Sequence, residues 1–254
     1  MTALTGYPIA VFVVTLLVLS ISTRVGAAIA RRQRGLDEHT REDFGVVQSA
    51  TLTLLGLIIG FSFSMAISRH DQRKQLEAEE ANAIGTEYLR ADLLPSADAA
   101  KVRGLLRRYI DQRILFYTIR DAQRLALIDT DTAALQADLW SAIRAAAANP
   151  TPVVALAVAG MNDVLNSQAY TLAAWGNRIP SSAWGLMAAI AIAGNLLMGY
   201  GARRAEAESM LLLVLPVLVA VAFLLIADLD SPRGGLIRVA PQNLRSLAQS
   251  LRGQ

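Results

Sequence analysis

The chain has 254 residues, of which 54% are hydrophobic, with a formal net charge of +3 and no cysteine. A net charge this small does not indicate a nucleic-acid partner, and the lack of cysteine excludes disulfides, thiolate metal sites and a cysteine nucleophile. The apolar residues form long runs separated by charged blocks, which is typical of an integral membrane protein with a substantial polar region.

Four apolar runs are long enough, or nearly so, to cross a bilayer, which requires about 20 residues. They are residues 9–30, 44–68, 181–202 and 209–227. The first run has neither a basic leader nor a small-residue cleavage site after it, so we expect a retained span and not a signal peptide. Arg24, late in this run, is expected to reach the membrane surface.

The polar region between spans two and three carries helix signals throughout. No proline interrupts residues 70–94, so the second span is expected to continue into the aqueous phase as one long helix. The next helix is predicted over residues 97–128, a third begins at a cap on Asp131 or Thr132, and a fourth covers residues 152–175.

These elements predict an all-α integral membrane protein with four transmembrane helices and a helical soluble region between spans two and three. The predicted domains are residues 1–68 (spans one and two), 69–180 (helical soluble domain), 181–229 (transmembrane hairpin) and 230–254 (C-terminal tail). Basic residues near the span ends are almost balanced between the two sides, so charge does not determine the orientation in the membrane.

The second span carries two stripes of residues that repeat every four positions. Small side chains, which let helices approach closely, make up one stripe: Gly56, Gly60, Ser64 and Ser68. The other stripe is bulkier and lies one position further round the helix: Thr53, Leu57, Phe61 and Met65. In a ring of subunits the bulky stripe could line an axial hydrophobic constriction. The alternative is that both stripes are ordinary interior packing.

A charged segment follows on the same helix and includes Glu77, Glu80, Asn82, Gly85, Glu87 and Arg90. One interpretation is a solvated face with ion pairs such as Glu87 with Arg90. The other starts from Gly85, which a helix interior tolerates poorly, and predicts a tight contact with a polar partner, which in an oligomer could be a second subunit.

The fourth span ends on Asp228 and Asp230, ahead of a turn that contains Arg233. These acids could bond backbone donors, pair with Arg233, or contribute to a cation site. Two carboxylates are too few to indicate a metal, so no metal site and no cofactor are predicted. The sequence also lacks catalytic motifs, and we do not expect an enzyme.

The segments LGLIIGFSFSMAISRHDQRKQLEAEEANAIGTEYLRADLLP and LIADLDSPRGGLIRV resemble the bacterial bestrophin-homologue family. Gly60, Phe61 and Arg69 also keep the spacing of a signature found in bestrophin anion channels. The resemblance implies a homopentamer in the bacterial inner membrane, with the helical region in the cytoplasm and an anion-conducting neck at Phe61, Leu57 and Thr53. Thr53 departs from a fully apolar neck.

The resulting functional hypothesis is a multi-pass, homo-oligomeric channel in the lipid bilayer. It would let small inorganic anions permeate passively through an axial pore lined by the second span. The alternative is a non-conducting membrane sensor or scaffold whose helical domain binds a ligand or partner.

Overall fold

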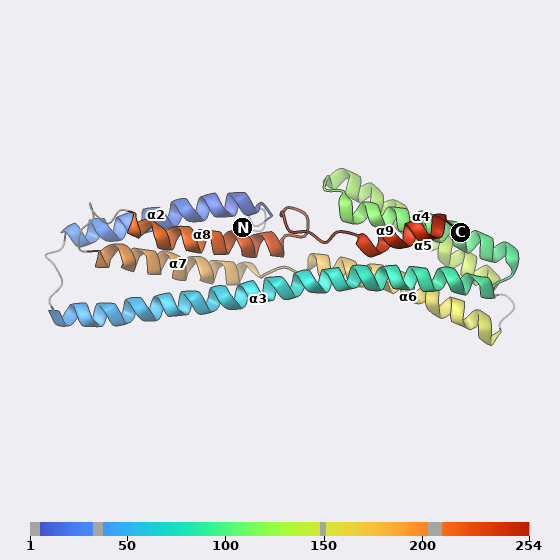
Figure 1. The fold of residues 1–254 in the computed structure, drawn as a ribbon, viewed down its shortest axis with the longest axis horizontal. Coiled ribbons are helices and arrows are strands. Elements are labelled where there is room, and N and C mark those ends of the chain that lie inside the picture. Colours follow the sequence, from blue (N-terminus) through green and yellow to red (C-terminus); the bar gives the residue numbers. More distant parts are fainter. Residues whose placement is uncertain (1–5, 33–37, 148–150, 203–209, 254) are drawn as a thin grey trace. The chain divides into compact units, whose positions relative to one another are not determined.

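The structure, a computed structural model, describes residues 6–32, 38–147, 151–202 and 210–253. The regular elements within these ranges are all helical (Figure 1). They are α2 (Pro8–Arg32), α3 (Glu38–Arg90), η1 (Ala91–Leu93), α4 (Ser96–Thr118), α5 (Ala122–Ala146), α6 (Pro152–Gly176), α7 (Ser181–Gly201), α8 (Leu211–Asp230) and α9 (Gln242–Arg252). Four candidate spans are long and apolar enough to cross a membrane, and they include α2, α3, α7 and α8. The predicted all-α fold with four spans is therefore confirmed.

The chain divides into two compact units. Unit 1 comprises Met1–Arg69 and Arg178–Arg238, and unit 2 comprises His70–Asn177 and Val239–Gln254. The continuous helix α3, 53 residues long, contributes to both, as the proline-free sequence predicts. The last helix, α9, in the segment predicted as a tail, belongs to unit 2.

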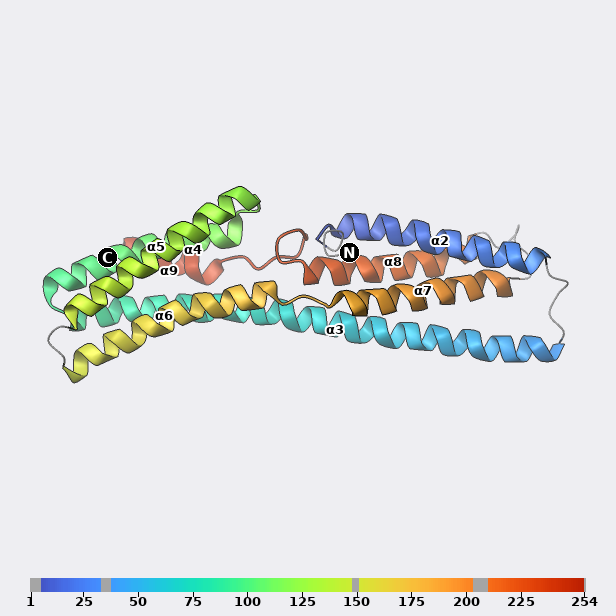
Figure 2. The same ribbon diagram turned by 180° about the vertical axis from the view of Figure 1, so that it is seen from behind.

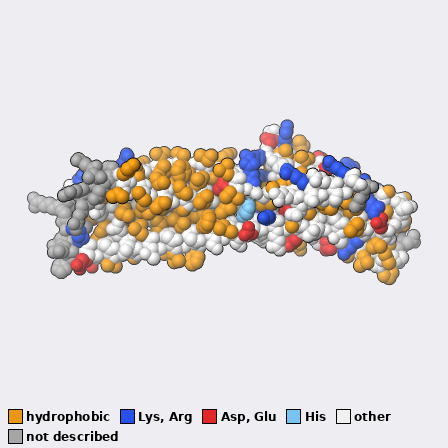
Figure 3. Space-filling view, in the orientation of Figure 1, with side chains coloured by type: hydrophobic (Ala, Val, Ile, Leu, Met, Phe, Trp, Pro, Cys, Tyr) orange, Lys and Arg blue, Asp and Glu red, His pale blue; other side chains and the backbone are white. Residues whose placement is uncertain are grey.

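In unit 1, α2 packs along α7 and α8, and α7 lies beside the first half of α3 in both ribbon views (Figures 1 and 2). The interior holds large side chains such as Leu19, Trp184, Met187 and Phe223. Hydrophobic side chains also cover much of the face of this unit that Figure 3 shows. Leu17 on α2 and Leu218 on α8 are 58% and 61% exposed, as expected for side chains that meet lipid.

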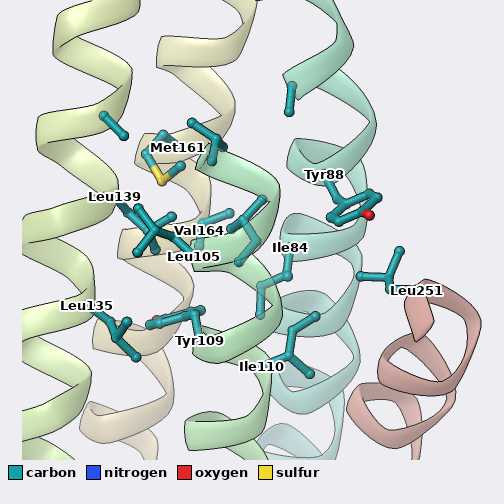
Figure 4. Packing of buried hydrophobic residues seen from close by; sticks show 14 of the residues in the cluster. Ile84, Tyr88, Leu105, Tyr109, Ile110, Leu135, Leu139, Met161, Val164 and Leu251 are labelled. Atoms are coloured by element: carbon teal, nitrogen blue, oxygen red, sulfur yellow. The ribbon is translucent and has the colours of Figure 1, made fainter. Parts of the chain in front are cut away.

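Unit 2 is a bundle of the second half of α3 with α4, α5, α6 and α9. Figure 4 shows its core, in which Ile84 and Tyr88 of α3 pack among residues of the other helices. Tyr109 on α4 and Leu139 on α5 are fully buried there. This apolar interior gives unit 2 a core of its own.

One helix boundary in unit 2 was predicted wrongly. The helix expected over residues 97–128 ends at Thr118, and the next begins at Ala122. The Asp121 carboxylate accepts a hydrogen bond from the Arg124 N–H at 2.9 Å, so Asp121 and not Asp131 or Thr132 is the cap. Both later residues lie inside α5, where Thr132 is buried.

Candidate functional site

The bulky stripe of α3 lies on the surface of this chain. Phe61, Leu57 and Met65 are 65%, 53% and 43% exposed, and Thr53 is exposed as well. The Thr53 hydroxyl donates to the Ser49 carbonyl at 2.8 Å, so it is satisfied by its own helix. The described helices therefore leave a continuous row of large side chains uncovered.

The small-residue stripe is uncovered too. Gly56, Gly60, Ser64 and Ser68 are all exposed. A Cβ atom added at Gly56 or Gly60 would meet no described atom within 4 Å. The face of α3 that packs inside unit 1 carries Leu55, Ser62 and Ala66 instead. Because successive helical residues are about 100° apart, both stripes lie on the opposite side of α3.

The close helix contact within unit 1 uses glycines that the sequence analysis did not single out. Gly26 on α2 and Gly199 on α7 are arranged reciprocally. A Cβ at Gly26 would overlap the Leu196 carbonyl oxygen, and a Cβ at Gly199 would overlap the Thr23 carbonyl oxygen. Beside them, the buried Asn195 side chain donates to the Ala191 carbonyl at 2.8 Å. In the sequence, each of these glycines lies within an apolar run. Neither belongs to a four-residue repeat of glycines, so nothing in the sequence identifies them as a contacting pair.

The two aspartates at the end of α8 bind the loop that follows and the neighbouring helices. The Asp228 carboxylate accepts hydrogen bonds from the N–H groups of Leu236 at 2.6 Å and Ile237 at 2.8 Å. The Asp230 carboxylate accepts from the Ile179 N–H at 3.0 Å and pairs with the Arg69 guanidinium at 3.4 Å. Bonding to backbone donors, one of the roles left open by the sequence, is found for both aspartates.

Glu80 sits at the centre of a polar cluster inside unit 2. Its carboxylate forms an ion pair with Arg113 of α4, and both side chains are fully buried. The Tyr117 hydroxyl donates to the same carboxylate at 3.1 Å and the Thr171 hydroxyl at 3.4 Å. Glu80 thus links α3, α4 and α6 through one buried charge.

Glu77 fixes the C-terminal helix. Its carboxylate accepts hydrogen bonds from the Leu244 N–H at 2.9 Å and the Asn243 side-chain amide at 2.7 Å, at the start of α9. An anion here satisfies otherwise unpaired N–H groups and suits the positive end of the helix. The side of α3 next to α9 also carries Asn82, which is exposed, and Gly85, where an added Cβ would lie 3.2 Å from the Leu247 side chain.

Glu87 completes this set of buried glutamates, but neither of its carboxylate oxygens has a hydrogen-bond partner among the described residues. Its neighbour Arg90 lies 3.9 Å from the Asp163 carboxylate of α6. The solvated-face interpretation is therefore wrong for Glu77, Glu80 and Glu87, since all three are at most 1% exposed. The close contact at Gly85 is with the Leu247 side chain of α9, which is apolar and not the polar partner expected. A contact with a second subunit stays a prediction.

Comparison with known proteins places the chain in a family. The model of the Bestrophin-like domain matches residues 9–244. A crystal structure of a bacterial bestrophin homologue from Klebsiella pneumoniae with a mutation has 13% identity and a TM-score of 0.64, with 95% of this chain and 94% of that chain covered. A structure of the Klebsiella pneumoniae homologue solved by Zn-SAD phasing has 14% identity and a TM-score of 0.61, with 96% and 95% covered.

A crystal structure of a variant membrane protein has 13% identity and a TM-score of 0.66, with 95% of this chain and 99% of that chain covered. No curated protein matches. At these identities the structural likeness shows a shared fold. Because the family model extends over most of the sequence, this chain belongs to the bestrophin-like family of channel-like membrane proteins.

Proposed function

We propose that this protein is a homo-oligomeric channel through which small inorganic anions permeate passively. In the assembly, expected to be a pentamer in the bacterial inner membrane, the bulky stripe of α3 (Thr53, Leu57, Phe61 and Met65) faces a shared axis. Phe61 and Leu57 form the narrowest, most hydrophobic part of the pathway. A hydrophobic constriction of this kind controls permeation through the ease with which it is wetted.

The uncovered face of α3 carries this proposal. A row of large side chains and an adjacent row of small ones both lie on the side of α3 away from Leu55, Ser62 and Ala66. Contact with lipid would explain a row of large apolar side chains, but it would not explain the adjacent row of glycines and serines. Small residues at four-residue spacing favour close packing against another helix. A neighbouring copy of α3 against the small stripe would turn the bulky stripe towards the axis.

The natural chain contains no cysteine, so single cysteines can be introduced without a background. We would place one each at Leu57, Phe61 and Met65 and treat the membrane-reconstituted protein with a charged, membrane-impermeant thiol reagent. Leu218→Cys is the matched control, because this side chain is 61% exposed on α8 and is expected to face lipid. Mass spectrometry then gives the fraction of chains that carry the label.

The proposal expects labelling of the α3 cysteines and protection of Leu218→Cys. It also expects Phe61→Ala and Leu57→Ala to increase anion conductance or weaken selectivity in planar bilayers, with Leu218→Ala unchanged. Protection of all three α3 cysteines in a folded oligomer that conducts anions would refute the axial position. Labelling without any current would instead favour a non-conducting sensor or scaffold.

A further inference from the structure

We propose that Glu87 is the proton-binding site of a pH switch in unit 2. In its neutral form it allows α6 to pack over it at Gly160, and loss of the proton at alkaline pH loosens the contact between α3 and α6. The inference does not depend on what the protein conducts.

The carboxyl group of Glu87 is buried without the partners that its neighbours have. Glu87 is 0% exposed, and in the described ranges no other buried carboxylate oxygen lacks a hydrogen-bond partner. Glu80 has Arg113, and Glu77 has the start of α9. A buried anion that accepts no hydrogen bond is strongly unfavourable, whereas a neutral carboxylic acid is tolerated far better.

The backbone of α6 lies directly against this carboxyl group. A Cβ atom at Gly160 would overlap both the Glu87 Oε2 atom and the Arg90 Nη1 atom, and would come 3.0 Å from the Arg90 Cδ atom. Glycine is therefore required for this approach of the two helices. Water that solvates an ionised Glu87 needs space on the side of the carboxyl group that α6 now fills.

The charged groups beside Glu87 act on its pKa in opposite directions. Arg90 lies on the same helix, and Asp163 on α6 is 3.9 Å from it. Asp92 of η1 forms an ion pair with Arg103 of α4. Burial raises the pKa of Glu87 from 4.5 to about 8, with Arg90 lowering it and Asp163 raising it by smaller amounts. Glu87 lies in unit 2, 18 residues beyond Arg69 and outside the apolar run 44–68 that spans the membrane.

The direction of the pH effect follows from proton linkage. A carboxyl whose pKa is higher when packed than when open favours the packed state most at low pH. That advantage falls as the pH rises from the ordinary value of 4.5 towards 8 and is fully lost above it. The contact between α3 and α6 should therefore weaken over this range and then become insensitive to further alkalinity.

The test is hydrogen exchange of the α6 amides in the full-length detergent-solubilised protein from pH 6 to 9.5, corrected for intrinsic exchange. For the wild type we expect protection to fall by up to about tenfold per pH unit and then level off above pH 8. Glu87→Gln, which mimics the neutral form, should give a flat profile. Glu79→Gln is the matched control: Glu79 is exposed on the same helix, and its replacement should leave the profile unchanged.

Two further variants test the site without altering Glu87. Asp163→Asn should move the midpoint of the pH-dependent loss of α6 protection to lower pH, and Arg90→Gln should move it to higher pH. Both side chains are at least 32% exposed, so both variants should fold. Identical profiles for wild type and Glu87→Gln would overturn the proposal. So would a midpoint that neither Asp163→Asn nor Arg90→Gln moves.

Discussion

The contact between Gly26 and Gly199 allows a sharp test of how the spans of unit 1 pack. The perturbation is Gly199→Ala, which adds a single methyl group to α7. This methyl would overlap the Thr23 carbonyl oxygen and lie 2.7 Å from the Thr23 carbonyl carbon, whereas ordinary contact begins at 3.4 Å. Because the obstructing atoms belong to the backbone of α2, rotation of a side chain cannot relieve the overlap.

The size of the effect follows from two opposing terms. Overpacking a well-packed interior typically costs about 1–3 kcal/mol, and a clash with backbone belongs at the upper end of that range. Replacing glycine by alanine inside a helix returns about 0.5–1 kcal/mol. The net destabilisation expected for Gly199→Ala is therefore about 2 kcal/mol, which for a chain of this size corresponds to a fall of about 4–8 °C in Tm.

Gly185 provides the matched control on the same helix. A Cβ atom added there would meet no described atom within 4 Å, so Gly185→Ala should be neutral or stabilising. The assay is thermal unfolding of the detergent-solubilised protein, followed by size-exclusion chromatography for both variants. Equal melting temperatures for Gly199→Ala and Gly185→Ala would show that α2 and α7 do not approach each other as described.

Four further substitutions, two of them combined in one variant, test the buried carboxylates. Arg113→Met should destabilise unit 2 by about 3–5 kcal/mol in chemical unfolding, because Glu80 is left buried without its cation; the double replacement Glu80→Met with Arg113→Met should recover most of the loss. Glu77→Gln removes the charge from the two hydrogen bonds at the start of α9. It should raise the amide exchange of that helix several-fold while leaving α5 unchanged. Asp228→Asn weakens the bonds to the loop after α8 and should lower stability by about 1.5–3 kcal/mol. An unchanged unfolding midpoint would count against that role.

The sequence alone was sufficient for the membrane architecture. The length of an apolar run and the absence of proline are properties of contiguous residues, so the four spans and the uninterrupted α3 could be predicted directly. The segments around Phe61 and Asp228 also carried the family resemblance, which the match over residues 9–244 confirms. The bulky and small stripes of α3 were visible as periodicity, and their role at a subunit axis stays a prediction.

The sequence was a weaker guide to where the helices end and to whether the charged residues of α3 are buried. The break before α5 depends on whether Asp121 or Asp131 caps a helix, and each has a side chain suited to that role. The glutamates of α3 have the spacing of exposed ion pairs, so their sequence pattern is equally compatible with a solvated helix.

The environment of those glutamates depends on the helices that pack against α3. Three other helices, α4, α6 and α9, lie against α3 and give each buried carboxylate a different neighbour. Glu80 meets a cation, Glu77 meets the start of a helix, and Glu87 meets the backbone at Gly160. A helix's own sequence sets which residues share a face, but what lies against that face is set by the packing of the remaining chain. The same argument explains why Gly26 and Gly199, which no glycine repeat in the sequence marks, form a close backbone contact between two spans.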